Sequence, residues 1–547
     1  GITASPLPWE GLKEYEHPEQ DAYSQLSAGA SVRVRSETVC TAAGETGSSF
    51  AGPILYPYVR WVLEESIKRG INRLYFIARD GWILYRMAER MIRVRSLPIK
   101  TAYICGSRKA WRLPCFDGSE EAFAKLLRWS NLDEALTLKE LAAVFAMDVL
   151  TLKQYLPLPF STMGDDVPLH AVDRKNIGAF LGENSGFLRA LVKSAEPQRR
   201  LLIRYLCQEV DLSDEHFAFV ELSGTGYTQK SLARLMHTFY TGTIRNFYFK
   251  LDTVPREEDC VYLNFCPGNI PRSYMLELLC RAPHGQTAGY REEAGRIIPV
   301  LEERGEAALS ASVLEEYCRA VLSYTDSMTQ ALLKNDFMPA PSPTLPAKYL
   351  RLIASEPPRH IARFFQDMPF SGSGRKNTRF APDITRREIR DIYIFGKGGG
   401  DWRRCYQGNS LDYALAVTPG AAAYAEKCLH ISRTAIGRRL KELYERLSGG
   451  TATALCPAAY LKGNIVIYGA GKVGEAYMKQ AKKKGSGCTG LLWVDTRLHG
   501  QKKAGMLIHP PQAIRERSCQ RIIIAVHTQK AAREIRESLL SMGIRRE

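Results

Sequence analysis

The first half of the chain alternates between short apolar runs and stretches with helical spacing. Residues 73–78, 101–107 and 243–251 have the apolar and β-branched character of strands. After a polar turn at 79–81, Ile83, Met87 and Met91 recur four residues apart, as they would on one face of a helix. Strands that alternate with helices in this way predict a mainly parallel α/β sheet.

The same patterns predict four regions. Residues 1–50, which are rich in Pro, Ser, Gly and Glu, are expected to form an irregular arm. Residues 51–302 carry the α/β pattern, and the helical stretch at about 115–212 is expected to be an insertion on top of the sheet. Residues 303–460 are expected to be mainly helical, and residues 461–547 to form a small Rossmann-like α/β domain.

Composition narrows the class of protein only in part. The chain has 547 residues, and its 75 basic and 58 acidic side chains give a formal net charge of +17, which favours anionic partners. Its 13 cysteines form no CxxC pair or Cys/His group, so neither a zinc site nor a disulfide framework is indicated. No apolar run approaches the roughly 18 residues of a membrane span, and no signal peptide is recognised. A cytoplasmic location is expected, with peripheral association at the inner face of the membrane left open.

The stretch "FAFVELSGTGYT", residues 217–228, is the most informative. An apolar run ends at Glu221 and is followed by small polar residues before helical spacing begins. Backbone amides and hydroxyls at a helix N-terminus favour a phosphate, and glycines let the backbone approach it. The alternative is an ordinary strand-to-helix turn capped by a threonine.

Two further turns follow predicted strands. The first contains Arg79, Asp80 and Gly81, and the second contains Ser107, Arg108 and Lys109. Ligands of open α/β sheets bind at the carboxyl edge, where such turns lie. An Arg–Asp pair is also common as a structural salt bridge. Together, the three turns indicate one polyanionic ligand.

These turns resemble the loops of type I phosphoribosyltransferases. "FVELSGTGYT" is similar to their ribose-phosphate loop, with Glu221 at the second acid and Thr225, Gly226 and Thr228 at the phosphate-binding end. "IARDGWIL" resembles their pyrophosphate loop, and "SRKA" stands where the family has a basic pyrophosphate contact. Val220 replaces the first acid, which leaves Glu221 to bind the ribose hydroxyls.

A closer resemblance covers residues 52–300. The blocks "RLYFIARDGWIL", "YICGSRKA", "FVELSGTGYTQKSL" and "YMLELLCRAPHGQTAGY" occur in the order found in a bacterial polysaccharide-biosynthesis group. Some of its members use phosphoribosyl pyrophosphate to build ribofuranose into surface glycans such as O antigen or capsule, often fused to a haloacid-dehalogenase-type phosphatase. Because the chain has no Asp-x-Asp-x-Thr motif, the resemblance implies a separate partner phosphatase that removes the 5-phosphate.

The implied reaction transfers 5-phosphoribosyl from phosphoribosyl pyrophosphate to a hydroxyl of a lipid-linked or free glycan, releasing pyrophosphate. Mg²⁺ is the implied cofactor, and Asp80 is its candidate protein ligand. Asp80 is also the first candidate for the general base, with Glu277 and His284 as alternatives. The implied donor-binding residues are Arg79, Gly81, Ser107, Arg108, Lys109, Glu221, Ser223, Gly224, Thr225, Gly226, Tyr227 and Thr228.

The C-terminal "YGAGKVG" supports a rival function. Gly469, Gly471 and Gly474 follow a predicted strand and Asp495 ends the next one, as in dinucleotide-binding folds. An NAD-dependent sugar oxidoreductase is therefore one alternative, and a noncatalytic scaffold of a glycan-assembly complex is another. The unit also resembles the small Rossmann-like appendages of sugar-biosynthesis proteins, which favours a structural role or sugar-nucleotide binding for it. Residues 430–447 could form a DNA-recognition helix, but they are interpreted as a basic amphipathic helix against the domain surface, and no nucleic-acid partner is expected. "FGKGGGD" at 395–401 lacks the ending of a Walker loop and is predicted to be a turn.

Overall fold

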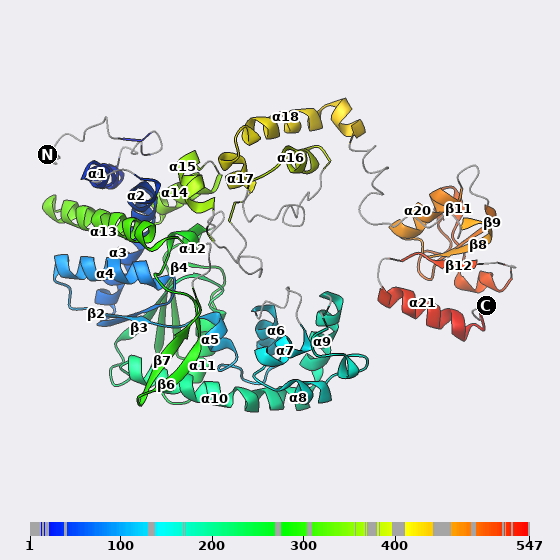
Figure 1. The fold of residues 1–547 in the computed structure, drawn as a ribbon, viewed down its shortest axis with the longest axis horizontal. Coiled ribbons are helices and arrows are strands. Elements are labelled where there is room, and N and C mark those ends of the chain that lie inside the picture. Colours follow the sequence, from blue (N-terminus) through cyan, green and yellow to red (C-terminus); the bar gives the residue numbers. More distant parts are fainter. Residues whose placement is uncertain are drawn as a thin grey trace. The chain divides into compact units, whose positions relative to one another are not determined.

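The fold is described from a computed structural model, drawn in Figure 1. The chain divides into two compact units, unit 1 with residues 1–386 and 401–422, and unit 2 with residues 387–400 and 423–547. The structure describes residues 12–13, 16, 21–37, 41–129, 137–167, 169, 171–268, 275–303, 309–355, 357–366, 368, 380–381, 383–395, 411–440, 461–482, 488–516, 519, 521–526 and 529–544.

Unit 1 is built on a five-stranded parallel sheet of order β2-β1-β3-β4-β5. Its strands are β1 (Arg73–Ile77), β2 (Lys100–Ile104), β3 (Phe217–Gly224), β4 (Ile244–Leu251) and β5 (Cys260–Asn264). The central strands are nearly continuous apolar runs because both faces of the sheet are covered. The prediction of an α/β fold with a mainly parallel sheet is confirmed.

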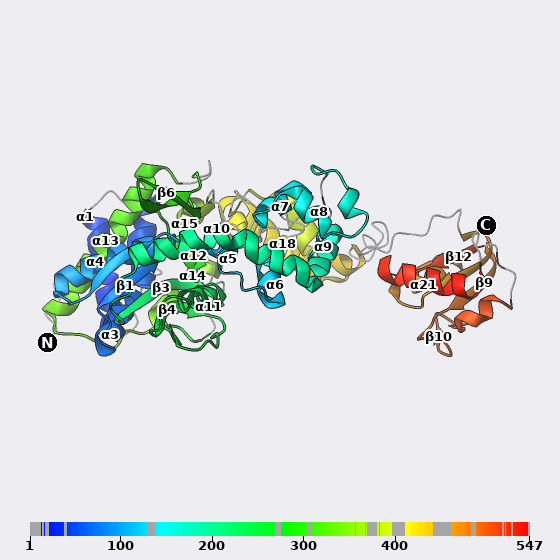
Figure 2. The same ribbon diagram turned by 90° about the horizontal axis from the view of Figure 1, so that it is seen from below.

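Helices cover the two faces of this sheet differently. One face packs against α3 (Gly52–Lys68) and α4 (Gly81–Arg95), and the other against α10 (Ser185–Glu209) and α11 (Tyr227–Met236), as Figures 1 and 2 show. The helix α13 (Ala311–Lys334) packs on α3 and α4 as a further layer. The connections after β1 and β3 therefore run to opposite faces of the sheet.

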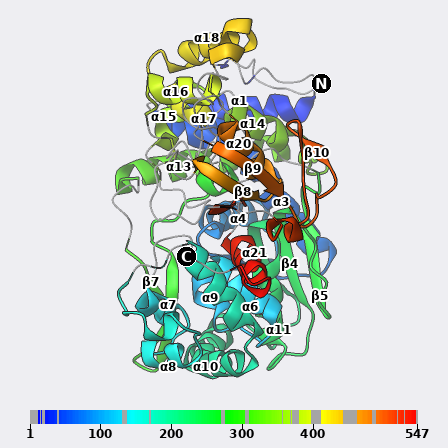
Figure 3. The same cartoon turned by 90° about the vertical axis from the view of Figure 1, so that its right-hand side faces the viewer.

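The segment between β2 and β3 is helical. It contains α5 (Arg108–Arg112), α6 (Glu120–Trp129), α7 (Leu138–Val144), α8 (Val149–Gln154), the 3₁₀ turn η4 (Phe160–Thr162) and α9 (Ala171–Glu183) before α10. Phe123, Phe145 and Phe187 are central to a separate apolar core there. Figure 1 shows these helices gathered along α10, and Figure 3 shows the same group viewed from the side. The helices agree with the expected insertion at about 115–212, while the domain limits stay a prediction.

The prediction of an irregular arm at residues 1–50 is wrong for those residues of this range that the structure describes. This part contains α1 (Ala22–Glu37), α2 (Ala42–Glu45) and the π-helical segment η3 (Thr46–Ala51). Ser27 and Tyr324 are hydrogen-bonded at 2.7 Å between hydroxyl oxygens, and the Ser31 hydroxyl donates to the Ser48 carbonyl at 2.9 Å. The small residues of this segment, which are also typical of loops, let helices approach one another closely. Composition alone does not distinguish a loop from a closely packed helix.

The chain after β5 continues to build unit 1. It contains α12 (Met275–Leu279), the antiparallel hairpin of β6 (Thr287–Glu293) and β7 (Arg296–Leu301), α13, α14 (Thr344–Ser355), α15 (Arg359–Gln366) and α17 (Leu411–Val417). Nearly all of α16 (Arg386–Tyr393) and most of α18 (Ala421–Arg433) belong to unit 2. Tyr324, Leu350 and Tyr413 belong to the core that covers the α4 face of the sheet. No core boundary therefore falls at residue 303. Most of "FGKGGGD" and residues 441–447 lie outside the described residues.

Unit 2 contains a second parallel sheet, of order β12-β8-β9. From residue 461 onward its elements are β8 (Gly463–Tyr468), α20 (Lys472–Ala481), β9 (Cys488–Val494), β10 (Lys502–Lys503), β11 (Met506–Leu507), the 3₁₀ turn η7 (Pro511–Ile514), β12 (Arg521–Ile524) and α21 (Gln529–Ser541). Among the helices described in the two units, none is long and apolar enough to cross a membrane.

Candidate functional site

The sheet of unit 1 has one point at which its connections change direction. Strands β1 and β3 are neighbours, yet α4 and α11 cover opposite faces. In open parallel sheets of this strand order, a crevice opens at the carboxyl ends of β1 and β3, and ligands bind there. The turns at 78–81 and 224–227 border this point, so two of the three predicted turns meet where the fold favours a ligand.

The turn after β3 is shaped by Gly226. This residue has φ +71°, and a Cβ atom added to it would lie 2.6 Å from Cγ of Pro255. Both the backbone conformation and the available space therefore require glycine. Gly226 is the N-cap of α11, and no side chain caps this helix end. The threonine cap considered as an alternative is thus not formed.

The other residues of this turn differ in exposure. Thr225 is exposed, and Ser223 and Thr228 are half-buried. The ring of Tyr227 lies under two cations of the helical segment, 5.7 Å from Cζ of Arg112 and 5.3 Å from Nζ of Lys125. Tyr227 therefore connects α11 to the helical segment.

Asp80 stands at the start of α4, after the cis peptide bond between Ala78 and Arg79. Its side chain forms no cap hydrogen bond with the helix. Burial raises the pKa of the Asp80 carboxyl to about 7, the nearby Glu277 adds to the shift, and Arg79 and Arg108 oppose it. Arg79 itself is exposed, and Gly81 packs closely against Phe76.

Glu221 is the second acid of the site. Burial raises its pKa to about 7, a hydrogen bond from Gln229 lowers it, and the nearby Asp80 raises it further. Nε2 of Gln229 donates to Oε1 of Glu221 at 2.6 Å, and the Tyr58 hydroxyl donates to the Glu221 carbonyl oxygen at 2.6 Å. The carboxylate is therefore held from α11, while the strand is anchored from α3.

The structure brings the candidate acids together although they are far apart in sequence. Asp80 is close enough to affect the titration of Glu221, and Glu277 affects that of Asp80. Arg281 joins this group: burial and the nearby Arg79 lower its pKa to about 10. The site thus contains two carboxyl groups, Asp80 and Glu221, that burial makes costly to charge, and guanidinium groups near enough to offset part of this cost.

The turn after β2 has a divided role. The Ser107 hydroxyl accepts from the amide of Ala110 at 3.0 Å and donates to the carbonyl of Thr287 at 2.6 Å, so it stabilises the start of α5 and the hairpin. Lys109 forms an ion pair with Glu302. Arg108 lowers the pKa of both Asp80 and Glu221, which places its charge near the acids.

His284 is positioned through an aromatic group. Its Nε2 lies 2.9 Å from the Tyr103 hydroxyl, and its Nδ1 lies 2.8 Å from the Gly285 carbonyl oxygen. Because Nδ1 must donate to that carbonyl, Nε2 of a neutral ring accepts from Tyr103. The ring packs edge-on against Trp82, beside the β1 turn.

Sequence reasoning missed Gln229, Arg281 and Tyr103. Gln229 and Arg281 lie inside quoted motifs but carry no local signal of function. Tyr103 precedes the second basic turn by four residues and has the pattern of an ordinary strand residue. Their positions near the acids arise from packing between distant segments.

The glycine-rich turn of unit 2 uses its acid differently. Oδ2 of Asp495 accepts from the amide of Ala470 at 2.7 Å, and Oδ1 accepts from the amides of Arg497 and Leu498 at 2.8 and 2.9 Å. Although burial opposes it, these bonds hold the pKa of Asp495 below its ordinary value. Gly474 packs against the Gly469 carbonyl, where a Cβ would approach to 1.7 Å. The acid and this glycine therefore already have structural roles.

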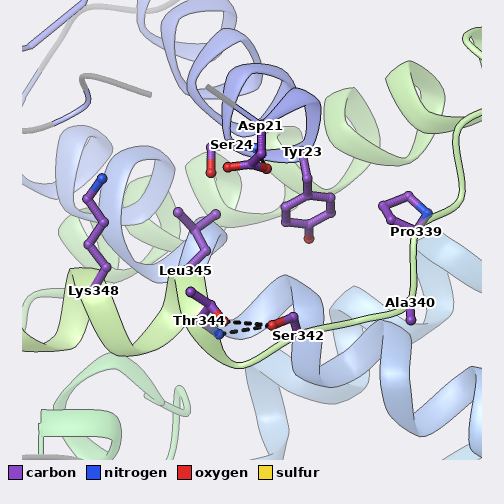
Figure 4. Close-up of a pocket in the computed structure, with 9 residues that line it drawn as sticks. All are labelled: Asp21, Tyr23, Ser24, Pro339, Ala340, Ser342, Thr344, Leu345 and Lys348. Carbon is purple, nitrogen blue, oxygen red and sulfur yellow. Dashed lines mark hydrogen bonds between the residues drawn. The ribbon is translucent and has the colours of Figure 1, made fainter. Parts of the chain in front are cut away.

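A cavity of about 290 Å³ lies elsewhere in unit 1, between the start of α1 and the segment leading into α14. Tyr23, Leu345 and Lys348 are among its lining residues, and Figure 4 shows them. None of the predicted site residues lines this cavity.

Comparison with models of known protein families and with curated protein sequences gives no match for this chain.

Proposed function

We propose that unit 1 is a glycan phosphoribosyltransferase that uses phosphoribosyl pyrophosphate as its donor. The observation that supports this best is the meeting of Asp80, Glu221 and Glu277 with Arg79, Arg108 and Arg281 at the carboxyl edge of the β1–β3 pair. Such a group offers positive charge to a pyrophosphate, carboxylates to sugar hydroxyls and an uncapped helix end to a phosphate.

The donor would lie across the two turns. Its 5-phosphate would bind at the start of α11, where Gly226 allows the backbone to approach and Thr225 and Thr228 offer hydroxyls. Glu221 would accept hydrogen bonds from the ribose hydroxyls. Because Gln229 fixes Oε1 of Glu221, the carboxylate needs little further ordering when the ribose binds.

Arg79 and Arg108 would stabilise the departing pyrophosphate, because guanidinium groups pair well with phosphate oxygens. When bound, Mg²⁺ supplies further charge to the leaving group; it is commonly held by one or two carboxylates, phosphate oxygens and waters. In the described residues, no group of three metal-binding side chains is placed to hold an ion. A metal ion that arrives bound to the donor needs only one or two carboxylates from the protein. Asp80, with Glu277 near it, could supply them.

In the reaction, the acceptor oxygen forms a bond to C1 of the ribose while the bond from C1 to the pyrophosphate oxygen breaks. The acceptor hydroxyl gives its proton to a base, and the bond electrons leave with pyrophosphate. Asp80 is the first candidate, since a carboxyl with a pKa of about 7 is a suitable base near neutral pH. Glu277 and His284 remain the alternatives.

The same proposal names an acceptor, a location and a partner enzyme. The acceptor would be a lipid-linked or free glycan. The protein would act in the cytoplasm or at the inner face of the membrane. A haloacid-dehalogenase-type phosphatase would then remove the 5-phosphate from the product. The net charge of +17 favours association with an anionic membrane surface.

The test is incubation of the full chain with phosphoribosyl pyrophosphate, Mg²⁺ and a panel of synthetic glycan acceptors. We expect pyrophosphate release that depends on an acceptor, and a product whose mass is increased by one phosphoribosyl group. Excess chelator should abolish both signals, since the arginines alone compensate too little charge. Thermal stabilisation by NAD but not by the donor would favour the oxidoreductase, and binding of neither ligand would favour the scaffold.

A further inference from the structure

A buried lysine stands beside the proposed phosphate-binding turn. Lys250, on β4, is 8% exposed. In the sheet it is paired with Ser223 of β3, so the two side chains project from the same face. The amide of Asp252 donates to the Gly224 carbonyl at 2.9 Å, which ties the end of β4 to the turn.

The charge of Lys250 is not balanced by the described part of the chain. Its Nζ donates to the Pro267 carbonyl at 3.5 Å, and no carboxylate of the described residues lies within 4.0 Å of it. An ammonium can donate three hydrogen bonds, and a buried charge is costly unless it is paired. The buried guanidinium of Arg60, by contrast, is bonded to Glu64 at 2.7 Å.

We propose that Lys250 is the cation of an anion subsite completed by the start of α11, and that the occupant is a phosphomonoester. The uncapped helix end and the ammonium both favour negative charge, and a phosphomonoester brings about −1.5 to −2 charges with three acceptor oxygens. Only the identification of this group as the donor's 5-phosphate rests on the proposed function.

The subsite sets the order of two reactions. A donor without its phosphate leaves Lys250 unpaired and is selected against, since an unpaired buried charge is penalised. The reaction that removes the phosphate must therefore act on the product, after transfer to the glycan.

The test measures binding of ribose 5-phosphate and of ribose to the full chain by calorimetry, in wild type, Lys250→Gln and Lys250→Met. Glutamine keeps a donor for the Pro267 carbonyl and removes the charge. We expect both variants to bind ribose 5-phosphate about 10- to 100-fold more weakly. Ribose should bind poorly to all three proteins. Lys153→Met is the matched control, because this partly exposed lysine pairs with Asp165 at 2.5 Å in the helical segment and should leave binding unchanged.

Stability separates a binding role from a structural one. Replacing an unpaired buried charge by methionine should leave the melting temperature of the ligand-free protein unchanged or raise it. If Lys250→Met does not fold, Lys250→Arg keeps the charge and must retain binding within a few-fold while Lys250→Gln loses it. Unchanged affinity in folded Lys250→Gln, or tighter binding of ribose or glucuronate than of ribose 5-phosphate, would overturn the subsite.

The two proposals fail separately. Binding of ribose 5-phosphate that depends on Lys250, without transfer from phosphoribosyl pyrophosphate, would refute the reaction and leave the subsite standing. Normal transfer and normal ribose 5-phosphate binding by Lys250→Gln would refute the subsite and leave the reaction standing.

Discussion

Two strand-to-helix turns of the chain, one after β3 and one after β8, carry similar glycine patterns, but the acids near them have opposite environments. In unit 2, Asp495 accepts three backbone hydrogen bonds and its pKa is lowered. In unit 1, burial and neighbouring acids raise the pKa of Glu221 and Asp80 to about 7. A carboxylate satisfied by the backbone supports the fold, whereas one that is buried with incomplete compensation is suited to binding or catalysis.

The largest effect is expected from Asp80→Asn. Loss of a general base typically lowers the rate by about 100- to 10,000-fold, so transfer to the glycan should fall by that range while donor binding persists. Arg79→Ala should instead impair every reaction of the donor. Assays of pyrophosphate release with and without acceptor distinguish the two. Near-normal glycan transfer by folded Asp80→Asn would reassign the base to Glu277 or His284, and Asp495→Asn serves as the control that should not affect transfer.

The glycines give a second, smaller contrast. Gly226→Val places a branched side chain at φ +71° against Pro255, and the left-handed conformation alone costs roughly 1–2 kcal/mol of stability. The turn must shift to relieve this strain, so contacts with the phosphate are lost and donor affinity should fall at least about 10-fold. Gly471→Ala is the matched variant in unit 2, because a Cβ there meets nothing within 4 Å. Donor titration of both variants checks this. Unchanged affinity in Gly226→Val would contradict phosphate binding at this turn.

The change of folding stability with pH should have opposite signs for the acids of the two units. Asp80 and Glu221 bind protons more readily in the folded state, so their contribution to stability is full below the unfolded pKa and is lost as the pH rises towards 7. Asp495 contributes above its unfolded pKa and loses this as the pH falls through its lowered folded pKa. Urea unfolding from pH 3 to about 8, with Asp80→Asn and Asp495→Asn for assignment, measures both slopes.

The rate of catalysis should increase over the pH range in which Asp80 loses its proton, whereas stability falls there. The base must be deprotonated, so kcat/KM should rise as the pH passes through about 7. In Asp80→Asn this rise should be smaller, because only the titration of Glu221 remains. A rise that persists unchanged in the variant would show that another group is the base.

The local parts of the fold could be predicted from the sequence. Ile83, Met87 and Met91 do form the buried stripe of α4, and the turns lie where strand and helix patterns meet. The helices within residues 1–50 were missed because Ser, Ala and Gly serve both loops and closely packed helices. Arg281 and Gln229 were missed because their closeness to the acids depends on segments that meet only in the folded chain.

The most direct test of the contrast between the two turns is hydrogen exchange of the full chain with and without phosphoribosyl pyrophosphate and Mg²⁺. We predict slower exchange of the amides at 226–230 and 79–84 when the donor is present, and no change at 469–475. Protection of residues 469–475 alone would place the ligand in unit 2 and contradict the assignment of the donor site to unit 1.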